Sequence, residues 1–223
     1  MPQDKELILY DYWRSSASYR VRIALNLLGL DYQTVPVNLL QKQHLDQSYQ
    51  DINPQGLVPS LRIGNHLLTQ SLAIIEYLHD TTPDSQLLPS DPADRAHIRQ
   101  LAHIIAMDIH PICNLGVVTH ITELADTSVR DADAIRSEWM RHYITKGLTA
   151  FETLLTGGEA SRFCCGDQPT LADICLVPQI YNARRWGADL AALPAIRRID
   201  DHCQSLEAFA AAHPDRVKPE AGS

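Results

Sequence analysis

The sequence has no long apolar run. A helix that spans a membrane needs roughly 20 consecutive apolar residues, and no part of the chain approaches that length without charges. Its first residues, MPQDKELILYDYW, also lack the basic stretch followed by an apolar run that marks a secretory signal. We therefore expect no membrane contact and a cytoplasmic location.

Basic charge is also scarce. The chain has 19 Lys and Arg against 27 Asp and Glu, which gives a formal net charge of -8. Phosphate-rich partners would meet net repulsion, so the composition argues against a nucleic-acid-binding or anionic-membrane-binding protein. Any anion has to be held by a local group of residues.

Cysteine is too sparse and irregular for a disulfide framework or a zinc site. There are five cysteines, and the positions of Cys113, Cys164, Cys165 and Cys175 match no zinc-ligand spacing. We expect reduced thiols, with the Cys164-Cys165 pair packed in the core. The segment that contains Asp108, His110 and Cys113 lacks a complete ligand set, so no metal is expected.

The first eighty residues do carry clear secondary-structure signals. Residues 7–12 read as a strand, and apolar spacing from Tyr19 predicts a helix that ends at Gly29. Residues 31–39 read as a second strand, which Pro36 places towards a sheet edge. This is a βαβ unit.

A hairpin and a helix follow that unit. After a polar, helix-like stretch, extended runs at 59–63 and 66–68 flank the turn signal Gly64-Asn65. Residues 71–80 read as a helix with Ser71 in the N-cap position. The predicted order of elements is therefore βαβ, helix, ββα.

Composition changes at residues 81–94, which are rich in proline and turn formers. Beyond them the pattern is helical, with predicted helices from Asp91-Pro92 to Pro111 and over 131–155, 171–185 and 194–211, before a frayed tail, HPDRVKPEAGS. Thr170 and Asp173 form a capping box, which we interpret as a folding signal. We predict an α/β domain at 1–82, a linker at 83–91 and an all-α domain at 92–223.

Two stretches of the first domain point to chemistry. A cis proline at Pro59 would expose the backbone of Val58 to a ligand, although trans is commoner for such a dipeptide. Gln70 and Ser71 precede a helix whose free amides suit a carboxylate, although a simple N-cap is an equally good explanation. Together they favour an extended, peptide-like ligand with a carboxylate at one end.

A third stretch, RSSASYRVRIALNLLGL at 14–30, combines an arginine with several hydroxyls where strand gives way to helix. The hydroxyls are either a helix cap or part of a reactive site. The best explanation for Arg14 is that its planar guanidinium binds a substrate carboxylate through two hydrogen bonds. The alternative is that Arg14 is a surface charge.

These features together resemble the cytosolic glutathione transferases, which have a thioredoxin-like first domain and an all-α second domain. Six ordered motifs are similar, more narrowly, to the zeta class, which includes maleylacetoacetate and maleylpyruvate isomerases. The motifs are YDYWRSSASYRVRIALNLLGL, NPQGLVPSL, QSLAIIEYL, DIHPICNL, GDQPTLADICLVPQIYNARRW and AHPDRVKP.

The resemblance implies a glutathione site. Ser15, with Ser16 as a possible substitute, would hydrogen-bond the glutathione sulfur, and this hydroxyl together with the helix start would lower the pKa of the thiol. Further glutathione contacts are implied for His44, Gln55, Val58, Pro59, Gln70, Ser71, Asp108 and His110.

It also implies an activity. Glutathione thiolate would add to the cis double bond of a maleyl diacid, and would leave after rotation to give the trans product in tyrosine and phenylalanine breakdown. Arg14, Arg185 and Asn114 are the implied substrate contacts, with Arg184 a weaker candidate than its neighbour. A homodimer is implied as well.

Two departures from the family pattern leave alternatives open. Ala17 or Ser18 stands where many members have cysteine, so the chain owns no thiol there. Leu115 and Gly116 stand near the place where maleylpyruvate isomerases can carry an extra arginine, which favours maleylacetoacetate over maleylpyruvate of the gentisate route. A non-catalytic glutathione-binding or stress-related protein is the alternative from another class.

Overall fold

The computed structural model describes residues 6–125, 130–157 and 161–219, so a few positions of the predicted domains and tail lie outside the described residues. Contacts divide the chain into two compact units. One comprises Met1–Leu88 with Gln204–Ser223, and the other comprises Pro89–Cys203. The predicted second domain ran to residue 223, and the structure differs by grouping the residues from Gln204 onward with the first unit.

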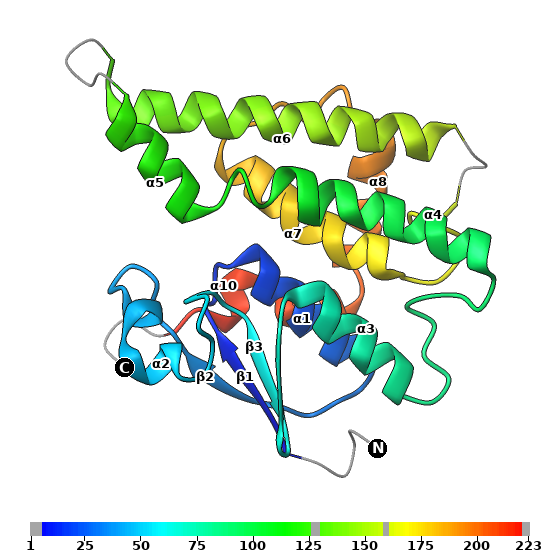
Figure 1. The fold of residues 1–223 in the computed structure, drawn as a ribbon. Helices are drawn as coiled ribbons and strands as arrows, with labels where there is room; N and C mark the ends of the chain where they lie inside the picture. Colours follow the sequence, from blue (N-terminus) through cyan, green and yellow to red (C-terminus); the bar gives the residue numbers. More distant parts are fainter. Residues whose placement is uncertain (1–5, 126–129, 158–160, 220–223) are drawn as a thin grey trace. The chain divides into compact units, whose positions relative to one another are not determined.

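The first unit contains a four-stranded sheet and its helices (Figure 1). Its elements are β1 (Leu7–Asp11), α1 (Ser16–Leu27), β2 (Gln33–Pro36), η2 (Gln43–Leu45), α2 (Gln47–Gln50), β3 (Ser60–Ile63), β4 (His66–Thr69), α3 (Ser71–Thr81), α9 (Glu207–Ala212) and α10 (Pro214–Val217).

The sheet has the strand order β2-β1-β3-β4. β1 pairs parallel with β2, with Leu9 opposite Thr34, and antiparallel with β3, where Leu9 faces Leu61. β3 and β4 form the antiparallel hairpin that the Gly64-Asn65 signal predicted. The predicted βαβ-ββα order is confirmed, and β2 is an edge strand, as Pro36 indicated.

Helix α1 is enclosed on nearly every side. Residues 17–25 are all buried, and a helix that is buried all round belongs to a core. It packs against both α3 and α9. The C-terminal segment is therefore part of the core around α1, and the predicted frayed tail instead contains α10.

The second unit is helical in its described residues. Its elements are α4 (Pro92–His103), the π-helix η3 (Ile104–Ile109), α5 (Leu115–Leu124), α6 (Ala132–Thr156), α7 (Leu171–Arg185) and α8 (Pro194–Gln204), whose last residue falls in the first unit.

Helix α7 forms the centre of this unit. Eleven of its fifteen residues are buried, and it packs against α4, α6 and η3 (Figure 1). The predicted capping box at its start is confirmed: Thr170 Oγ1 accepts from Ala172 N at 3.3 Å, while Asp173 Oδ2 accepts from Thr170 N at 2.8 Å.

Several predicted boundaries are wrong. The helix that starts at Asp91-Pro92 changes to a π-helix after His103, and α5 was not predicted. The predicted helix 194–211 is interrupted after Gln204. Helix α1 begins at Ser16 rather than near Tyr19, because Ser15 caps it.

Candidate active site

The turn between β1 and α1 presents the hydroxyl of Ser15 at a helix start. The amide of Ser15 donates to Tyr12 O at 2.8 Å, which closes the turn. Ser15 Oγ accepts from Ser18 N at 3.3 Å as the N-cap of α1. This cap uses an oxygen lone pair, so the hydroxyl hydrogen is left for another acceptor. One residue can therefore cap the helix and donate to a thiolate.

Arg14 and Ser16 flank Ser15 and are both half-buried. The guanidinium of Arg14 lies over the ring of Trp13, 5.2 Å from its centroid. Stacking on an aromatic face restrains a guanidinium without neutralising it. Arg14 can still offer its charge to a carboxylate.

The peptide bond between Val58 and Pro59 is cis, as the hypothesis of an exposed Val58 backbone required. The carbonyl before it is braced, because Leu57 O accepts from Tyr49 Oη at 2.7 Å and from Asn53 Nδ2 at 2.7 Å. Sequence reasoning missed both Tyr49 and Asn53. The available signal was a tyrosine and an asparagine just before the proline motif, and the structure shows that both are buried.

Gln70, not Ser71, is the N-cap of α3, so that assignment is corrected. Gln70 has a φ of 69°, in a region that residues other than glycine seldom adopt, and strained backbone of this kind gathers at ligand sites. Its Nε2 donates to Gln55 Oε1 at 3.0 Å. The structure thus brings two predicted glutathione contacts together.

Ser71 is buried in the first turn of α3 and accepts from Arg20 Nη1 at 3.3 Å. Arg20 is only 1% exposed, so its positive charge adds to the dipole of the helix N-terminus. A carboxylate at Ser71 would be stabilised by both. Sequence reasoning missed Arg20, whose only signal was a charged residue within an apolar helix.

His44 lies in η2 and is half-buried. Burial lowers the pKa of its imidazole, and Lys42 acts in the same direction while Asp46 opposes it. The neutral ring can then donate one hydrogen bond and accept another. Gly56 has a φ of 61°, and a Cβ there would lie 3.0 Å from His44 O, so glycine allows the two segments to approach.

The other predicted site residues belong to the second unit. Asp108 is exposed in η3, and His110 is half-buried just after it. Asn114 caps α5 by accepting from Gly116 N at 3.0 Å. The predicted roles of these three residues in binding glutathione and substrate stay predictions.

Arg185 and Arg184 end α7 in different surroundings. Arg184 Nη1 forms an ion pair with the buried Asp200 Oδ2 at 2.7 Å. Arg185 is exposed and lies over the ring of Trp186 at 5.0 Å. The role of Arg185 as a substrate contact stays a prediction, and the ion pair gives Arg184 a structural role instead.

Three thiols of the second unit are poor nucleophiles. Burial raises the pKa of Cys113 to about 11 and that of Cys165 to about 12, and also raises the pKa of the fully buried Cys164. A protonated thiol is unreactive. In the part of the chain that the structure describes, no group of three or more His, Cys, Asp or Glu residues could hold a metal ion.

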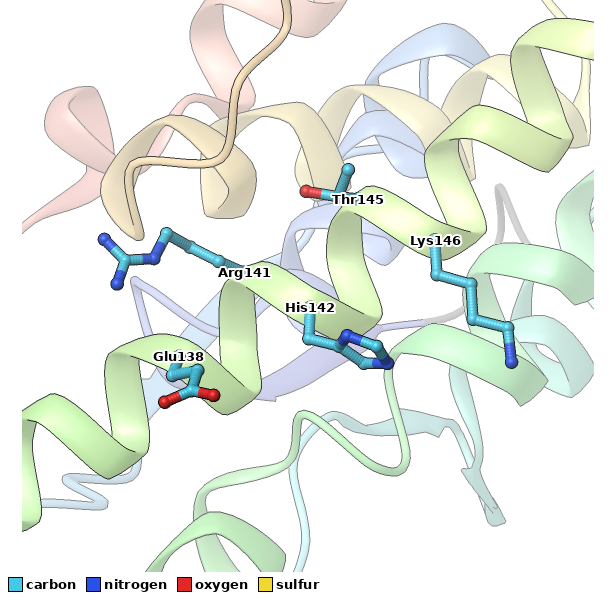
Figure 2. A pocket seen from close by; sticks show the side chains of 5 residues that line it. All are labelled: Glu138, Arg141, His142, Thr145 and Lys146. Carbon is cyan, nitrogen blue, oxygen red and sulfur yellow. The ribbon is translucent and has the colours of Figure 1, made fainter.

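A shallow hollow of about 480 Å³ lies along α6 (Figure 2). Its lining side chains all come from exposed positions on this one helix: Glu138, Arg141, His142, Thr145 and Lys146. None of them is a predicted site residue. We assign no binding role to this hollow.

Comparison with known proteins agrees with this geometry. Family models described as "Glutathione S-transferase, N-terminal domain" and "Glutathione S-transferase, C-terminal domain" match residues 9–86 and 133–205. Among the described residues, no helix is long and apolar enough to cross a membrane. The fold and the paired domain matches define a glutathione S-transferase.

Individual relatives narrow the class. The maleylacetoacetate isomerase of Rhizobium meliloti (strain 1021) is 56% identical over 214 residues, which cover 96% of this chain and 99% of the relative. A solved maleylpyruvate isomerase, described as a bacterial zeta-class glutathione S-transferase, has a TM-score of 0.90 at 41% identity and covers 96% of this chain and 100% of its own.

A third relative was solved with ligands. The maleylacetoacetate isomerase of Anaeromyxobacter dehalogenans 2CP-1, with bound dicarboxyethyl glutathione and citrate in its active site, has a TM-score of 0.85 at 42% identity, covering 99% of this chain and 96% of that one. The chain therefore belongs to the zeta-class glutathione S-transferases, in the group of the maleylacetoacetate isomerases. The resemblance inferred from six sequence motifs is confirmed.

Proposed function

We propose that this protein is a glutathione-dependent cis–trans isomerase that converts maleylacetoacetate to fumarylacetoacetate. The observation that carries the proposal is the hydroxyl of Ser15 at the start of α1, next to the positively charged Arg14. The 56% identical relative named maleylacetoacetate isomerase supports the choice of substrate.

The residues of the first unit fit glutathione. We include the backbone of Val58 as a contact for this peptide-like ligand, and the braced carbonyl of Leu57 supports it by fixing that segment. At the start of α3, Ser71 and the buried Arg20 suit the γ-glutamyl carboxylate. When bound, glutathione supplies a thiolate that adds to the cis double bond and leaves once the resulting single bond has rotated.

The chain's own groups have separate tasks in this reaction. Ser15 Oγ donates its hydrogen to the sulfur, and the dipole of α1 adds a positive potential, so both hold the sulfur ionised. Arg14 binds a substrate carboxylate and stabilises the negative charge that develops on the carbonyl oxygen. We include Arg185 and Asn114 in the proposal as further substrate contacts, and His44, Asp108 and His110 as further glutathione contacts.

The direct test is an assay with purified protein, maleylacetoacetate and a catalytic amount of glutathione. We expect fumarylacetoacetate to form while the glutathione concentration stays constant. Consumption of glutathione in proportion to product would contradict isomerisation and indicate a conjugating transferase. Glutathione binding with no turnover of any maleyl diacid would support the non-catalytic alternative.

Maleylpyruvate is the second candidate substrate, because the solved maleylpyruvate isomerase covers nearly the whole chain. Leu115 and Gly116 favour maleylacetoacetate, since an arginine near this position would provide a further carboxylate contact. The ratio of kcat/KM for the two substrates decides between them. A strong preference for maleylpyruvate would replace the first proposal.

We also propose that the protein acts in the cytoplasm as a homodimer, in the breakdown of tyrosine and phenylalanine. Membership of the family supports these points. Sedimentation velocity would test the oligomeric state, and a single species with the mass of one chain would contradict the dimer. Deletion of the gene should block growth on tyrosine if the pathway is correct.

A further inference from the structure

All three guanidinium nitrogens of Arg22 donate hydrogen bonds within the first unit. Its Nη1 donates to Asp11 Oδ1 at 2.7 Å and Oδ2 at 2.8 Å, its Nη2 donates to Trp13 O at 2.9 Å, and its Nε donates to Ala212 O at 3.1 Å. The side chain is 1% exposed. One residue therefore connects the end of β1, the turn after it and the C-terminal segment.

The hydrogen bond from Arg22 to Trp13 O falls inside the candidate active site. Trp13 O belongs to the turn that Ser15 N closes on Tyr12 O at 2.8 Å. It lies one residue before Arg14 and two before Ser15. A change in the orientation of this peptide would therefore move the cap hydroxyl of Ser15.

The hydrogen bond to Ala212 O anchors the guanidinium to the C-terminal segment, which we define as residues 207–218. The packing of this segment on α1 also includes Tyr19 Oη, which donates to Phe209 O at 3.5 Å, and Asn26 Nδ2, which donates to Ala208 O at 3.0 Å. Lys218 Nζ lies over the ring of Trp13, 5.4 Å from its centroid. The segment thus contacts the turn directly as well as through Arg22.

A planar guanidinium is required for this arrangement. Its three nitrogens point in fixed directions at three separate groups, whereas a lysine has one nitrogen on a flexible stem. Lysine could keep the charge next to Asp11, but it could not also hold Trp13 O and Ala212 O. The geometry of the contacts, rather than the charge alone, is the specific contribution of Arg22.

We propose that Arg22 is a positioning residue for the isomerase, which orients the turn Tyr12–Ser15, and with it the hydroxyl of Ser15 and the side chain of Arg14, by anchoring the turn to the C-terminal segment. The inference rests on the proposed function for the use of Ser15. It adds the C-terminal segment, far away in the sequence, to the parts that prepare the glutathione sulfur.

The test compares R22K with N26A. Both substitutions remove a hydrogen bond from α1 to the C-terminal segment. The hydrogen bond of Asn26 does not involve the turn Tyr12–Ser15, whereas Arg22 also binds this turn. We measure thermal unfolding, the pKa of the thiol of bound glutathione from its ultraviolet absorbance, and kcat and KM. For R22K we expect the bound thiol to titrate about one pH unit higher, a tenfold change in its ionisation constant.

The other readouts separate positioning from general destabilisation. R22K should lower kcat and raise KM for the substrate, because Ser15 and Arg14 are both displaced, while KM for glutathione should change less, because the groups that bind glutathione at α3 are untouched. N26A should lower the unfolding temperature while the thiol pKa and kcat stay at the wild-type values. A folded R22K with an unchanged thiol pKa, or an equal increase in both variants, would overturn the proposal.

A second variant covers the case in which R22K does not fold. Lys218 is exposed, so K218A removes its contact with Trp13 without opening the core. A raised thiol pKa in K218A supports the proposal, and an unchanged one overturns it. The thiol titration needs only glutathione binding, so a wild type that binds glutathione without isomerising maleylacetoacetate refutes the proposed function and leaves this test intact.

Discussion

Glu152 in α6 binds the start of α8 through the backbone of Ile196. Its Oε2 accepts from Ile196 N at 2.8 Å, and its Oε1 accepts from Ala195 N at 2.8 Å. The side chain therefore satisfies two of the amides that a helix N-terminus leaves without a partner, and its charge meets the positive end of the helix dipole. A residue on one helix caps another that lies more than forty positions away in the sequence.

Replacing this carboxylate should destabilise the fold markedly. We expect E152A to lower the free energy of unfolding by about 3 kcal/mol, because the buried amide of Ile196 and the partly buried amide of Ala195 both lose charged hydrogen bonds. E152Q should cost less, since its amide oxygen can still accept. Urea unfolding measures both values. E138Q is the matched control on α6: Glu138 is exposed and pairs with Arg130, so its loss should have little effect.

Gly147 in α6 allows η3 to pack closely. A Cβ at this position would lie 2.4 Å from Ile109 Cδ1 and 2.4 Å from Ile109 Cγ1. G147A should therefore destabilise the protein by about 1 kcal/mol, because overpacking of about 2 kcal/mol exceeds a gain in helix propensity of about 1 kcal/mol. Urea unfolding of the variant measures the net effect.

The double variant identifies the cause. I109A removes the side-chain atoms that the new methyl group would meet. In an I109A background, G147A should stabilise by about 1 kcal/mol, because only the propensity gain is left. Equal effects of G147A in both backgrounds would mean that the contact with Ile109 does not set the cost.

Ionisation of Cys113 should make stability fall at high pH. Burial raises the pKa of this thiol from 9.0 to about 11. The unfolded chain therefore releases the proton first, so the free energy of unfolding declines as pH rises from about 9 to about 11. In C113A the slope of the free energy of unfolding against pH should be shallower, by an amount that corresponds to the release of up to about one proton. Urea unfolding over this pH range tests it, and parallel curves for wild type and C113A would contradict it.

Much of the first unit could be predicted because its signals are local. The turn at Gly64-Asn65 and the apolar spacing of α1 each act within a few residues. The Val58-Pro59 bond is different, since the dipeptide alone favours trans, and the family resemblance implied a backbone contact of Val58 with glutathione but not the cis bond that the structure contains. The roles of the buried Arg20 and Arg22 could not be predicted, because Ser71 and Ala212, with which they form hydrogen bonds, lie far away in the sequence.

The second unit shows the same limit. Helix α5 was missed because Val117, Val118 and Thr119 are β-branched and Gly116 lies in its first turn, all of which lower helix propensity. The π-helix η3 packs closely against Gly147 through Ile109, a tertiary contact that periodicity does not report. The sequence alone did not distinguish the structural roles of Arg184 and Arg185. The structure does so through the ion pair between Arg184 and Asp200.

Substitution of Arg14 or Arg185 should weaken substrate binding more than glutathione binding. For R14M and R185M we expect KM for the maleyl substrate to rise at least about tenfold, since a charged hydrogen bond contributes about 1.5 to 3 kcal/mol. The Kd for glutathione, from calorimetry, should change less than about twofold if each arginine binds only substrate. R184M is the control and should lower stability through loss of the pair with Asp200. Equal losses of substrate and glutathione binding in R14M or R185M would indicate a structural role.

Ser15 combines two roles that substitution can separate. S15A should cost about 1 kcal/mol of stability, because the amide of Ser18 loses its cap. It should also raise the pKa of the bound glutathione thiol by about one unit and slow isomerisation, since the sulfur loses its hydroxyl donor. S15T retains a hydroxyl that can cap and donate, so it should restore both properties in large part. S16A is the control for position, because Ser16 is the first residue of α1 and not its cap. If S16A raises the thiol pKa while S15A leaves it unchanged, the cap and the thiolate donor are different residues, and Ser15 serves the helix alone.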